Sequence, residues 1–240
     1  MLQKTELLIL RTIRYGDSSL ILKTYSQEQG VLSLIASVSK KSKSNLKPSL
    51  LQPLNWLESV YYSKSKGDLK RLKEVRVTYH YQSLPYEPVK SCLALFLAEI
   101  LQHSLQEEEP QTGLYDFLKT SLQQLDQTSH PVGNFHLGFL LALSRYLGFA
   151  PQKAGQEPLY FDLLEGQYTG IQPHHGHFIG QPELAYWQDL QELPLEECHQ
   201  LKMPATLRAQ LLQHLLAFYR LHVHDFGKLK SLEILQQVLR

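Results

Sequence analysis

Cysteine is almost missing from this sequence, with two residues in a chain of 240. Cys92 and Cys198 stand far apart in segments with helical patterning, so we expect two buried thiols of a cytoplasmic protein and no disulfide. No window approaches 18 uninterrupted apolar residues, which argues against a transmembrane helix. The apolar run in MLQKTELLILRTIRYG is short, is broken by Arg11 and has no small-residue cleavage site, so we expect no signal peptide and no membrane partner.

Motifs for phosphate binding and catalysis are also missing. The sequence contains neither G-x-x-x-x-G-K-[ST] nor G-x-G-x-x-G, and its acidic run at 107–109 sits at a helix start, where it favours the helix dipole. Cys198 and His199 are neighbours, but on a helix they point about 100° apart. No orienting acid or oxyanion donor accompanies them. We therefore predict a protein without enzymatic activity or cofactor, which acts by binding.

What the sequence does have is an uneven distribution of charge. The net charge is +1, but residues 1–80 hold 14 Lys and Arg against 6 Asp and Glu, a balance of +8. Residues 81–240 hold 10 against 17, a balance of −7. A basic part joined to an acidic part indicates a nucleic-acid-binding domain attached to a domain with another task.

The first part of the chain has the pattern of a small β-barrel. Short apolar or alternating segments recur about every ten residues, with turn signals such as YGDS, QEQG and SKSKGD between them, at 6–14, 19–26, 30–38, 54–62 and 71–81. Five such strands, with a long connection before the fourth, favour the five-stranded OB-fold barrel. We predict an OB-fold domain over residues 1–82.

From Pro88 the apolar period becomes helical. Helix-like segments are expected at 88–105, 107–127, 130–151, 193–201, 204–223 and 229–239. They predict an α-helical domain over 83–240, which makes the fold class α+β. The interval 152–186 interrupts the helices and is rich in Gly, Pro, Tyr and His. We expect it to form a small insertion containing a hairpin packed by its own aromatic residues.

Several segments together resemble the RecO family of bacterial recombination mediators. They are, in order, ILRTIRYGDSSLIL, YSQEQGVLSLIASVSKKSKS, LLQPLNWLESVYY, ALSRYLGFAPQ and LKSLEIL. Each is weakly specific alone, but their order and spacing extend over nearly the whole chain. The resemblance implies an OB-fold followed by a helical domain, in agreement with the reading of the elements.

The resemblance also implies a function. A RecO-like protein is expected to bind single- and double-stranded DNA in homologous recombination and DNA repair, in the bacterial cytoplasm at the nucleoid. It would act with RecR, displace single-strand binding protein, load RecA and promote annealing of complementary strands. Its helical domain would engage the acidic, apolar C-terminal tail of single-strand binding protein. An acidic helical domain is a less obvious host for that tail, unless Lys119, Arg145 or Arg208 gather locally.

The interval after GFAP departs from the family pattern. Many RecO-like proteins have a four-cysteine zinc site there, whereas 152–186 contains no cysteine. His174, His175 and His177 could bind a metal with His199 or Asp162. Adjacent histidines on an extended segment point to opposite sides, which is poor for chelation. We favour a polar hairpin tip and expect no metal.

The candidate DNA-binding residues lie in two lysine loops and on the first two strands. One loop is SVSKKSKSNLKP, and the other is the turn between the fourth and fifth strands. The residues are Arg11, Arg14, Lys23, Tyr25, Lys40, Lys41, Lys43, Lys47, Lys64 and Lys66. Cations would neutralise phosphates and the tyrosine would stack on bases. The alternatives are a merely solvated basic surface, and an OB-fold adaptor that binds another protein and no DNA directly.

Overall fold

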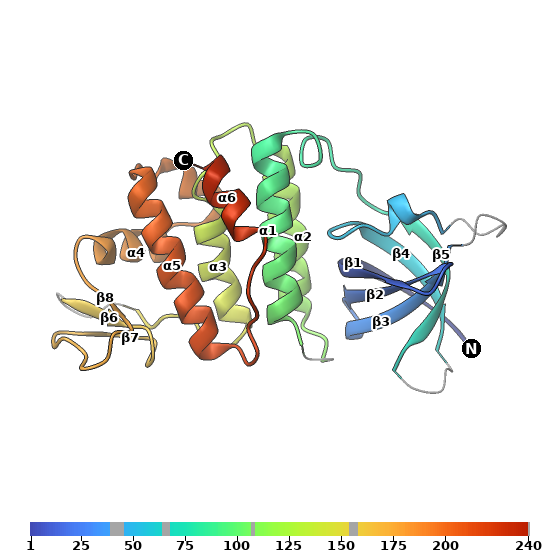
Figure 1. Cartoon of the computed structure of the whole chain (residues 1–240), viewed down its shortest axis with the longest axis horizontal. Helices are drawn as coiled ribbons and strands as arrows, with labels where there is room; N and C mark the ends of the chain where they lie inside the picture. Colours follow the sequence, from blue (N-terminus) through green and yellow to red (C-terminus); the bar gives the residue numbers. More distant parts are fainter. Residues whose placement is uncertain (39–45, 64–67, 107–108, 154–157, 240) are drawn as a thin grey trace. The chain divides into compact units, whose positions relative to one another are not determined.

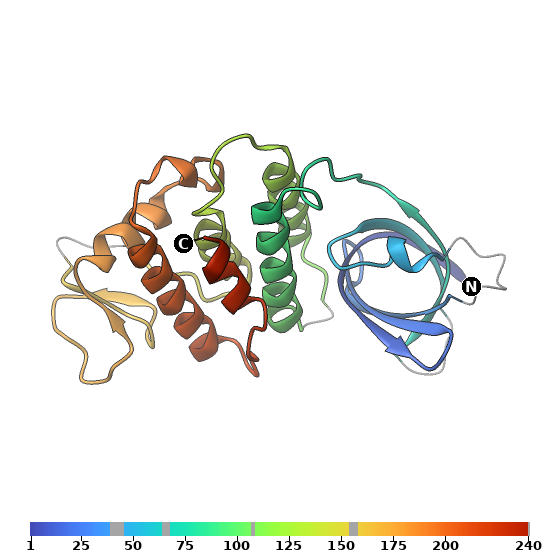
Figure 2. The ribbon, with the colours of Figure 1, turned by 45° about the horizontal axis from the view of Figure 1, so that its top comes forward.

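The computed structural model describes residues 1–38, 46–63, 68–106, 109–153 and 158–239. The chain forms two compact units, one of residues 1–82 with 94–119 and the other of residues 83–93 with 120–240. In the first unit five strands close into a barrel of order β1-β2-β3-β5-β4, which confirms the OB-fold barrel (Figures 1 and 2). The second unit is mainly helical, so the fold class is as expected.

The barrel strands match the predicted segments closely. They are β1 (Leu2–Tyr15), β2 (Ser19–Ser26), β3 (Gly30–Ser37), β4 (Trp56–Tyr62) and β5 (Lys70–Val77), with the 3-10 turn η1 (Pro48–Leu50) before β4. Strand β1 pairs antiparallel with both β2 and β4, and β3 pairs parallel with β5 to close the ring. The fifth strand ends at Val77, four residues before the predicted boundary.

The barrel interior is filled by side chains at alternate positions. The buried cluster consists of Leu7, Ile9, Leu20, Leu22, Leu32, Leu34, Ala36, Leu46, Leu51, Leu57, Tyr61 and Leu72. Successive side chains of a strand point to opposite faces, so a strand covered on one face alternates between buried and exposed residues. Part of β1 departs from this alternation, since Leu7 to Leu10 are all buried. Such a continuous run means that this stretch is covered on both faces.

Helices of the first unit cover the outer face of this stretch of β1. The helix α1 (Pro88–Ser104) and the helix α2 (Thr112–Gln127) both contribute residues to this unit. Tyr115 of α2 packs edge-on against Trp56 of β4, with ring centroids 5.3 Å apart. The register places Trp56 directly opposite Leu8 of β1. The outer side of β1 and β4 at this level is therefore as apolar as the barrel interior.

In the second unit the core is built around α3 (Phe135–Tyr146). Nine of its 12 residues are buried, which is the composition of a helix surrounded by protein on all sides. It packs against α4 (Glu183–Glu192), against the 3-10 segment η2 (Leu195–Gln200) and against α5 (Ala205–His222). The last element is the short helix α6 (Leu232–Val238).

Two helical expectations need correction. Helix α4 begins inside the interval 152–186, for which the sequence predicts an irregular insertion. It continues through 187–192, for which the sequence predicts no helix or strand. Leu184, Trp187 and Leu190 recur every third residue and are buried, so the helical period is present but short. The segment expected as a helix at 193–201 is a 3-10 turn, in which Cys198 alone is buried.

The interval 152–186 forms a three-stranded sheet of order β7-β6-β8. Its strands are β6 (Tyr160–Asp162), β7 (Gln167–Thr169) and β8 (Phe178–Ile179). The expected hairpin is β6 with β7, and β8 adds a third strand. Phe161 lies at the centre, 4.9 Å from the Tyr168 ring, 5.0 Å from Trp187 and 5.9 Å from Phe218. The aromatic residues thus pack on α4 and α5 as well as on one another.

Candidate nucleic-acid interface

Three neighbouring strands of the barrel share one outer face. Leu20, Leu22, Leu32 and Leu34 point inward, so the residues between them point outward. We call the outward set the β1–β2–β3 outer face, and it consists of Arg11, Ile13, Tyr15, Ser19, Ile21, Lys23, Ser33, Ile35 and Ser37. These side chains are half-buried or exposed, and they form cross-strand rows that can contact a ligand together.

Two of the predicted DNA-binding residues lie side by side on this face. Arg11 of β1 is directly opposite Lys23 of β2 in the strand register. Arg11 is exposed, and Lys23 is half-buried with its Nζ donating to the Gln102 carbonyl of α1 at 3.3 Å. Burial lowers the pKa of Lys23, and the nearby Arg11 charge lowers it further. Among the described residues, neither Arg11 nor Lys23 forms an ion pair with an acid.

A third basic group adjoins this pair. Burial lowers the pKa of His103, near the end of α1, and the charges of Arg11 and Lys23 lower it further while Glu99 opposes them. Burial is the main cause of this shift, and the charges of Arg11 and Lys23 add to it. An anion placed here would relieve the repulsion among these groups.

Three cations beside β1 and β4 are neutralised. Lys4 and Arg76 both contact Glu58, at 2.8 Å and 3.3 Å. Lys119 of α2 contacts Glu6 at 2.7 Å. Burial raises the pKa of Glu6, but hydrogen bonds from Lys119 and Tyr115 outweigh it and hold the pKa below its usual value. The contrast leaves the β1–β2–β3 outer face as a site of uncompensated positive charge.

Arg14 does not join Arg11. A bulge between Ile9 and Arg11 shifts the register of β1, after which residues alternate regularly toward Tyr15. Arg14 is therefore opposite Leu20, an interior position, and its side chain is exposed at the rim of the barrel. Lys47 is exposed just before η1. The sequence places Arg11 and Arg14 in one group, whereas the strand separates them.

Tyr25 has a different environment from the one that base stacking requires. It is only 2% exposed, and its hydroxyl accepts from the Gln111 backbone N–H at 3.3 Å. The register explains the burial, because Tyr25 is opposite Leu8, which is in turn opposite Trp56. A buried ring offers no face to a base. The structure gives Tyr25 a packing position and no stacking surface.

The remaining predicted residues fall in two loops. Lys40, Lys41 and Lys43 lie outside the described residues, as do Lys64 and Lys66. Val38, the last described residue before the first of these loops, donates its N–H to the Ser18 carbonyl in the β1–β2 turn.

Sequence reasoning missed the apolar part of the outer face. Ile13, Ile21 and Ile35 form a continuous cross-strand row, and Tyr15 follows on β1. Ile13 is 41% exposed and Tyr15 is 58% exposed. The alternation of side chains along β1 and β2 already indicates which residues face outward. Isoleucines in a strand are usually assigned to the interior, so the outward position of this row was not predicted. Once Leu20 and Leu22 are assigned to the interior, Ile21 must face outward.

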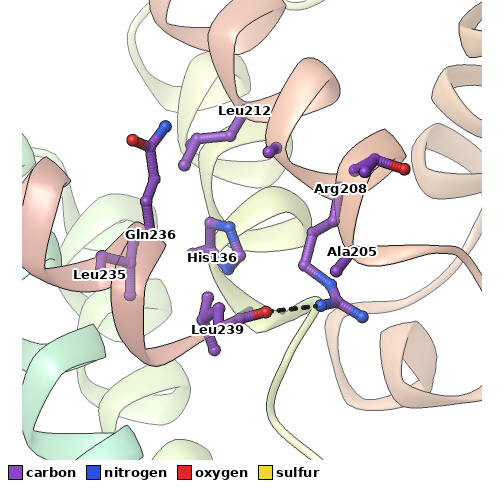
Figure 3. Close-up of a pocket in the computed structure, with 9 residues that line it drawn as sticks. His136, Ala205, Arg208, Leu212, Leu235, Gln236 and Leu239 are labelled. Carbon is purple, nitrogen blue, oxygen red and sulfur yellow. Dashed lines mark hydrogen bonds between the residues drawn. The ribbon is translucent and has the colours of Figure 1, made fainter.

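The helical unit has a cavity of about 380 Å³ between α3, α5 and α6 (Figure 3). Its lining is mostly apolar and includes Leu212, Leu235 and Leu239. Arg208 is the charged residue in the lining, and it donates to the Asn134 side chain at 2.9 Å and to the Leu239 carbonyl at 3.2 Å. His136 lines the same cavity from α3, and burial and the Arg208 charge lower its pKa to about 3. The cavity thus combines apolar walls with one guanidinium.

The histidines of the small sheet form a different arrangement. His175 Nε2 lies 3.2 Å from Asp162 Oδ2, and Asp162 Oδ1 accepts from the backbone N–H of Leu164 and of Glu165. Over the part of the chain that the structure describes, no three His, Cys, Asp or Glu side chains gather as metal ligands would. The Asp162–His175 contact joins the loop before β8 to the β6–β7 turn.

Cys198 is enclosed below α3. Both cysteines are free thiols, Cys92 half-buried and Cys198 1% exposed. Burial raises the pKa of Cys198 to about 11, so the thiol is protonated at neutral pH and is a poor nucleophile.

No helix in the described ranges has both the length and the apolar composition needed to span a bilayer.

Comparison with known proteins gives matches along the whole chain. A family model described as Recombination protein O N terminal matches residues 1–81, and one described as Recombination protein O C terminal matches residues 85–233. The chain is 36% identical over 239 residues to the DNA repair protein RecO of Phocaeicola vulgatus, with 99% of each chain covered. It is 36% identical to the protein of that name from Bacteroides fragilis, again over 99% of each, and 35% identical to that of Christiangramia forsetii, also over 99% of each.

Proposed function

Because this chain belongs to the RecO family of DNA repair proteins, we propose that it is a non-enzymatic mediator of homologous recombination whose barrel binds DNA directly. The supporting observation is the Arg11–Lys23 pair, two adjacent cations on the β1–β2–β3 outer face with no acidic partner among the described residues, whereas Lys4 and Lys119 beside β1 and β4 each have one. Phosphate oxygens are the natural counter-charge for such a pair, and they bind in exchange for condensed counterions.

The domain responsible for binding is residues 1–82, and 83–240 form the helical domain with its insertion at 152–186. Lys40, Lys41, Lys43 and Lys47, together with Lys64 and Lys66, extend the phosphate-binding surface from the barrel loops, and Arg14 adds to it from the rim. Both single- and double-stranded DNA would use this surface, because phosphates are common to both.

The cellular role follows the family. The protein would work with RecR in the bacterial cytoplasm, at the nucleoid, to displace single-strand binding protein and so allow RecA to load. It would also anneal complementary strands, since neutralising phosphates lowers the repulsion between two strands brought together. It would need no cofactor.

The test is fluorescence anisotropy of a labelled single-stranded oligonucleotide over a series of salt concentrations. Replacing Arg11 and Lys23 by Gln should reduce the slope of log affinity against log salt by about two, one for each lost phosphate contact. The matched control replaces Lys4 and Arg76 by Gln, since Glu58 already neutralises them. A second variant, Lys40, Lys41 and Lys43 to Ala, tests the loop in the same way.

Two results would overturn the proposal. An absence of binding at low salt would remove direct DNA recognition and leave the protein–protein adaptor. If the slope of log affinity against log salt is the same for the wild type and both variants, the DNA-binding surface lies elsewhere on the protein.

We further propose that the cavity between α3, α5 and α6 takes the acidic, apolar C-terminal tail of single-strand binding protein. Its apolar lining fits a hydrophobic side chain and Arg208, the charged residue of that lining, fits a carboxylate, whereas Arg145 does not line the cavity. Filling the cavity with Ala209→Phe should abolish binding of a labelled tail peptide and leave oligonucleotide binding unchanged. Undiminished peptide binding by this variant would exclude the cavity.

A further inference from the structure

Arg208 in the cavity of the helical unit is already held by two groups of this chain. Its Nε donates to the Asn134 side chain at 2.9 Å, and its Nη1 donates to the carbonyl of Leu239, directly after α6, at 3.2 Å (Figure 3). A carboxylate gripped by two parallel N–H groups needs one edge of the guanidinium. With Nε engaged by Asn134, the edge that is left is Nη1 with Nη2. A carboxylate can therefore use this edge only if the Leu239 carbonyl leaves it.

The α6 segment, which we define as residues 231–239, has few buried contacts. Helix α6 has seven residues, and Leu235 is the buried one. Its opposite side carries Ile234 and Val238, which are 51% and 37% exposed. A helix of two turns is not stable in water by itself, so α6 depends on its contacts at the cavity. Segments with so few buried apolar contacts are the ones that open locally in a native protein.

The chain before the α6 segment is anchored more firmly. Leu229 is 3% exposed, and the Phe226 ring lies 5.5 Å from the Tyr219 ring of α5. An opening of residues 231–239 would leave these contacts in place. The α6 segment can thus leave the cavity while the helices that form the rest of the core stay folded.

The α6 segment covers space that it does not fill. A cavity of about 380 Å³ remains under it, although protein interiors usually contain few voids larger than a water molecule. Leu239 also lines a second hollow of about 540 Å³, together with Lys90, His130 and Gly133. A Cβ on Gly133 would lie 3.5 Å from Arg208 Cζ, so Arg208 and Leu239 stand where the two hollows meet. Removing the α6 segment would open one longer groove with Arg208 in it.

We infer that the α6 segment is a displaceable cover, which occupies the cavity until a peptide with an apolar side chain and a carboxylate replaces it. The inference rests on the proposed tail site and adds its regulation. Leu235 takes the place of the apolar side chain, and the Leu239 carbonyl takes the place of the carboxylate. The carboxylate forms the stronger bond to Arg208, because it is charged. Docking of α6 and binding of the tail exclude each other, so the apparent affinity is reduced to the fraction of molecules that are open.

Two substitutions in α6 distinguish a cover from a fixed wall. Leu235→Ser weakens the docking of α6, and a labelled tail peptide should bind this variant about tenfold or more tightly than the wild type in fluorescence anisotropy. If α6 were a fixed wall, the same change would remove an apolar contact and weaken binding. The matched control is Ile234→Ser on the exposed side of the same helix, which should stay within about twofold of the wild type.

A second pair of variants leaves the cavity lining untouched. Gln237 is exposed and does not line the cavity. Gln237→Pro breaks the helix, because proline has no N–H and its ring clashes with the preceding turn. It should raise peptide affinity as Leu235→Ser does, whereas Gln237→Ala keeps the helix and should match the wild type within about twofold. Far-UV circular dichroism checks that all four variants are folded.

Hydrogen exchange of the wild-type protein measures the displacement itself. At saturating tail peptide the amides of residues 232–239 should exchange about tenfold faster than in the free protein, because α6 has lost its place. A peptide that binds beside a docked α6 would slow their exchange instead.

The outcomes separate the cover from the site on which it depends. Unchanged or lower peptide affinity in Leu235→Ser and Gln237→Pro, or slower exchange of residues 232–239 with peptide, would overturn the cover and leave the tail site intact. An absence of peptide binding by the wild type and by all four variants would reject the tail site itself, and the inference with it.

Discussion

Lys119 Nζ lies 2.7 Å from Glu6 Oε2 and connects helix α2 to the first strand of the barrel. Glu6 is directly opposite Glu58 in the β1–β4 register, so two carboxylates share one side of the sheet. Each has its own cation, Lys119 for Glu6 and Lys4 for Glu58. Like charges opposite each other destabilise a strand pair, and the lysines remove that cost.

We expect Lys119→Met to reduce the free energy of unfolding by about 1–2 kcal/mol. The half-buried Glu6 carboxylate would lose its cation and would still face the Glu58 carboxylate. The measurement is urea denaturation followed by far-UV circular dichroism. Lys4→Met is the control, since Lys4 is 62% exposed and the loss of its solvent-screened pair should cost clearly less than the loss of Lys119. Equal losses for the two variants would contradict the assignment.

Asp126 holds the segment that enters α1. Its Oδ1 accepts from the backbone N–H of Ser83 and of Leu84, each at 2.8 Å. Lys90 is 4% exposed and donates to the carbonyls of Asp126 and Thr128, at 3.1 and 2.8 Å. We expect Asp126→Ala to cost about 2–4 kcal/mol, because two N–H groups lose their acceptor beside a buried ammonium. Asp116→Ala, at an exposed site of α2, should cost less than about 0.5 kcal/mol in the same assay.

Gly138 of α3 is a close-approach position. A Cβ added there would lie 2.4 Å from Cys198 Sγ and 3.2 Å from Leu195 Cδ1, so η2 would have to move. We expect Gly138→Ala to destabilise the protein by about 1–3 kcal/mol through overpacking. Adding Cys198→Ala should recover part of this loss, and the coupling energy can be read from a double-mutant cycle. Strictly additive effects would show that the two residues do not touch.

His136 makes stability depend on pH. Its pKa in the folded protein is about 3, against 6.5 for an unperturbed histidine, because burial and the Arg208 charge disfavour the imidazolium. Below pH 6.5 the unfolded chain binds a proton that the folded chain does not, so this contribution to stability is present above pH 6.5 and is lost as the pH falls toward 3.

The expected slope from His136 is about 1.4 kcal/mol per pH unit between pH 6 and 4. Urea unfolding of the wild type and of His136→Leu at several pH values measures it, and the variant should show a correspondingly shallower dependence. His224→Gln, with an 86% exposed side chain, is the control and should follow the wild type. Parallel curves for wild type and His136→Leu would mean that the pKa of His136 does not change on folding.

The sequence alone was sufficient for the order of the elements. Period-two alternation and Gly turns predicted the five strands within a few residues. Each strand buries mainly one face in the barrel core, so its apolar residues recur at every second position. The helical period predicted α1, α2, α3, α5 and α6 for the same reason. It failed at α4, where Leu184, Trp187 and Leu190 give too short a run to stand out from a Gly- and Pro-rich neighbourhood.

Only the tertiary structure decided which side chains can meet a ligand. Tyr25 cannot stack on a base because it is buried. It is paired with Leu8, Leu8 is paired with Trp56, and Trp56 packs against Tyr115 of helix α2. A bulge between Ile9 and Arg11 puts Arg11 opposite Lys23 on the outer face, although Leu7 and Ile9 before it are interior. Composition and spacing determined the fold and its positive charge, since these depend on local pattern. The contents of the outer face depend on register and on which segments cover it, and these are long-range properties that no local pattern contains.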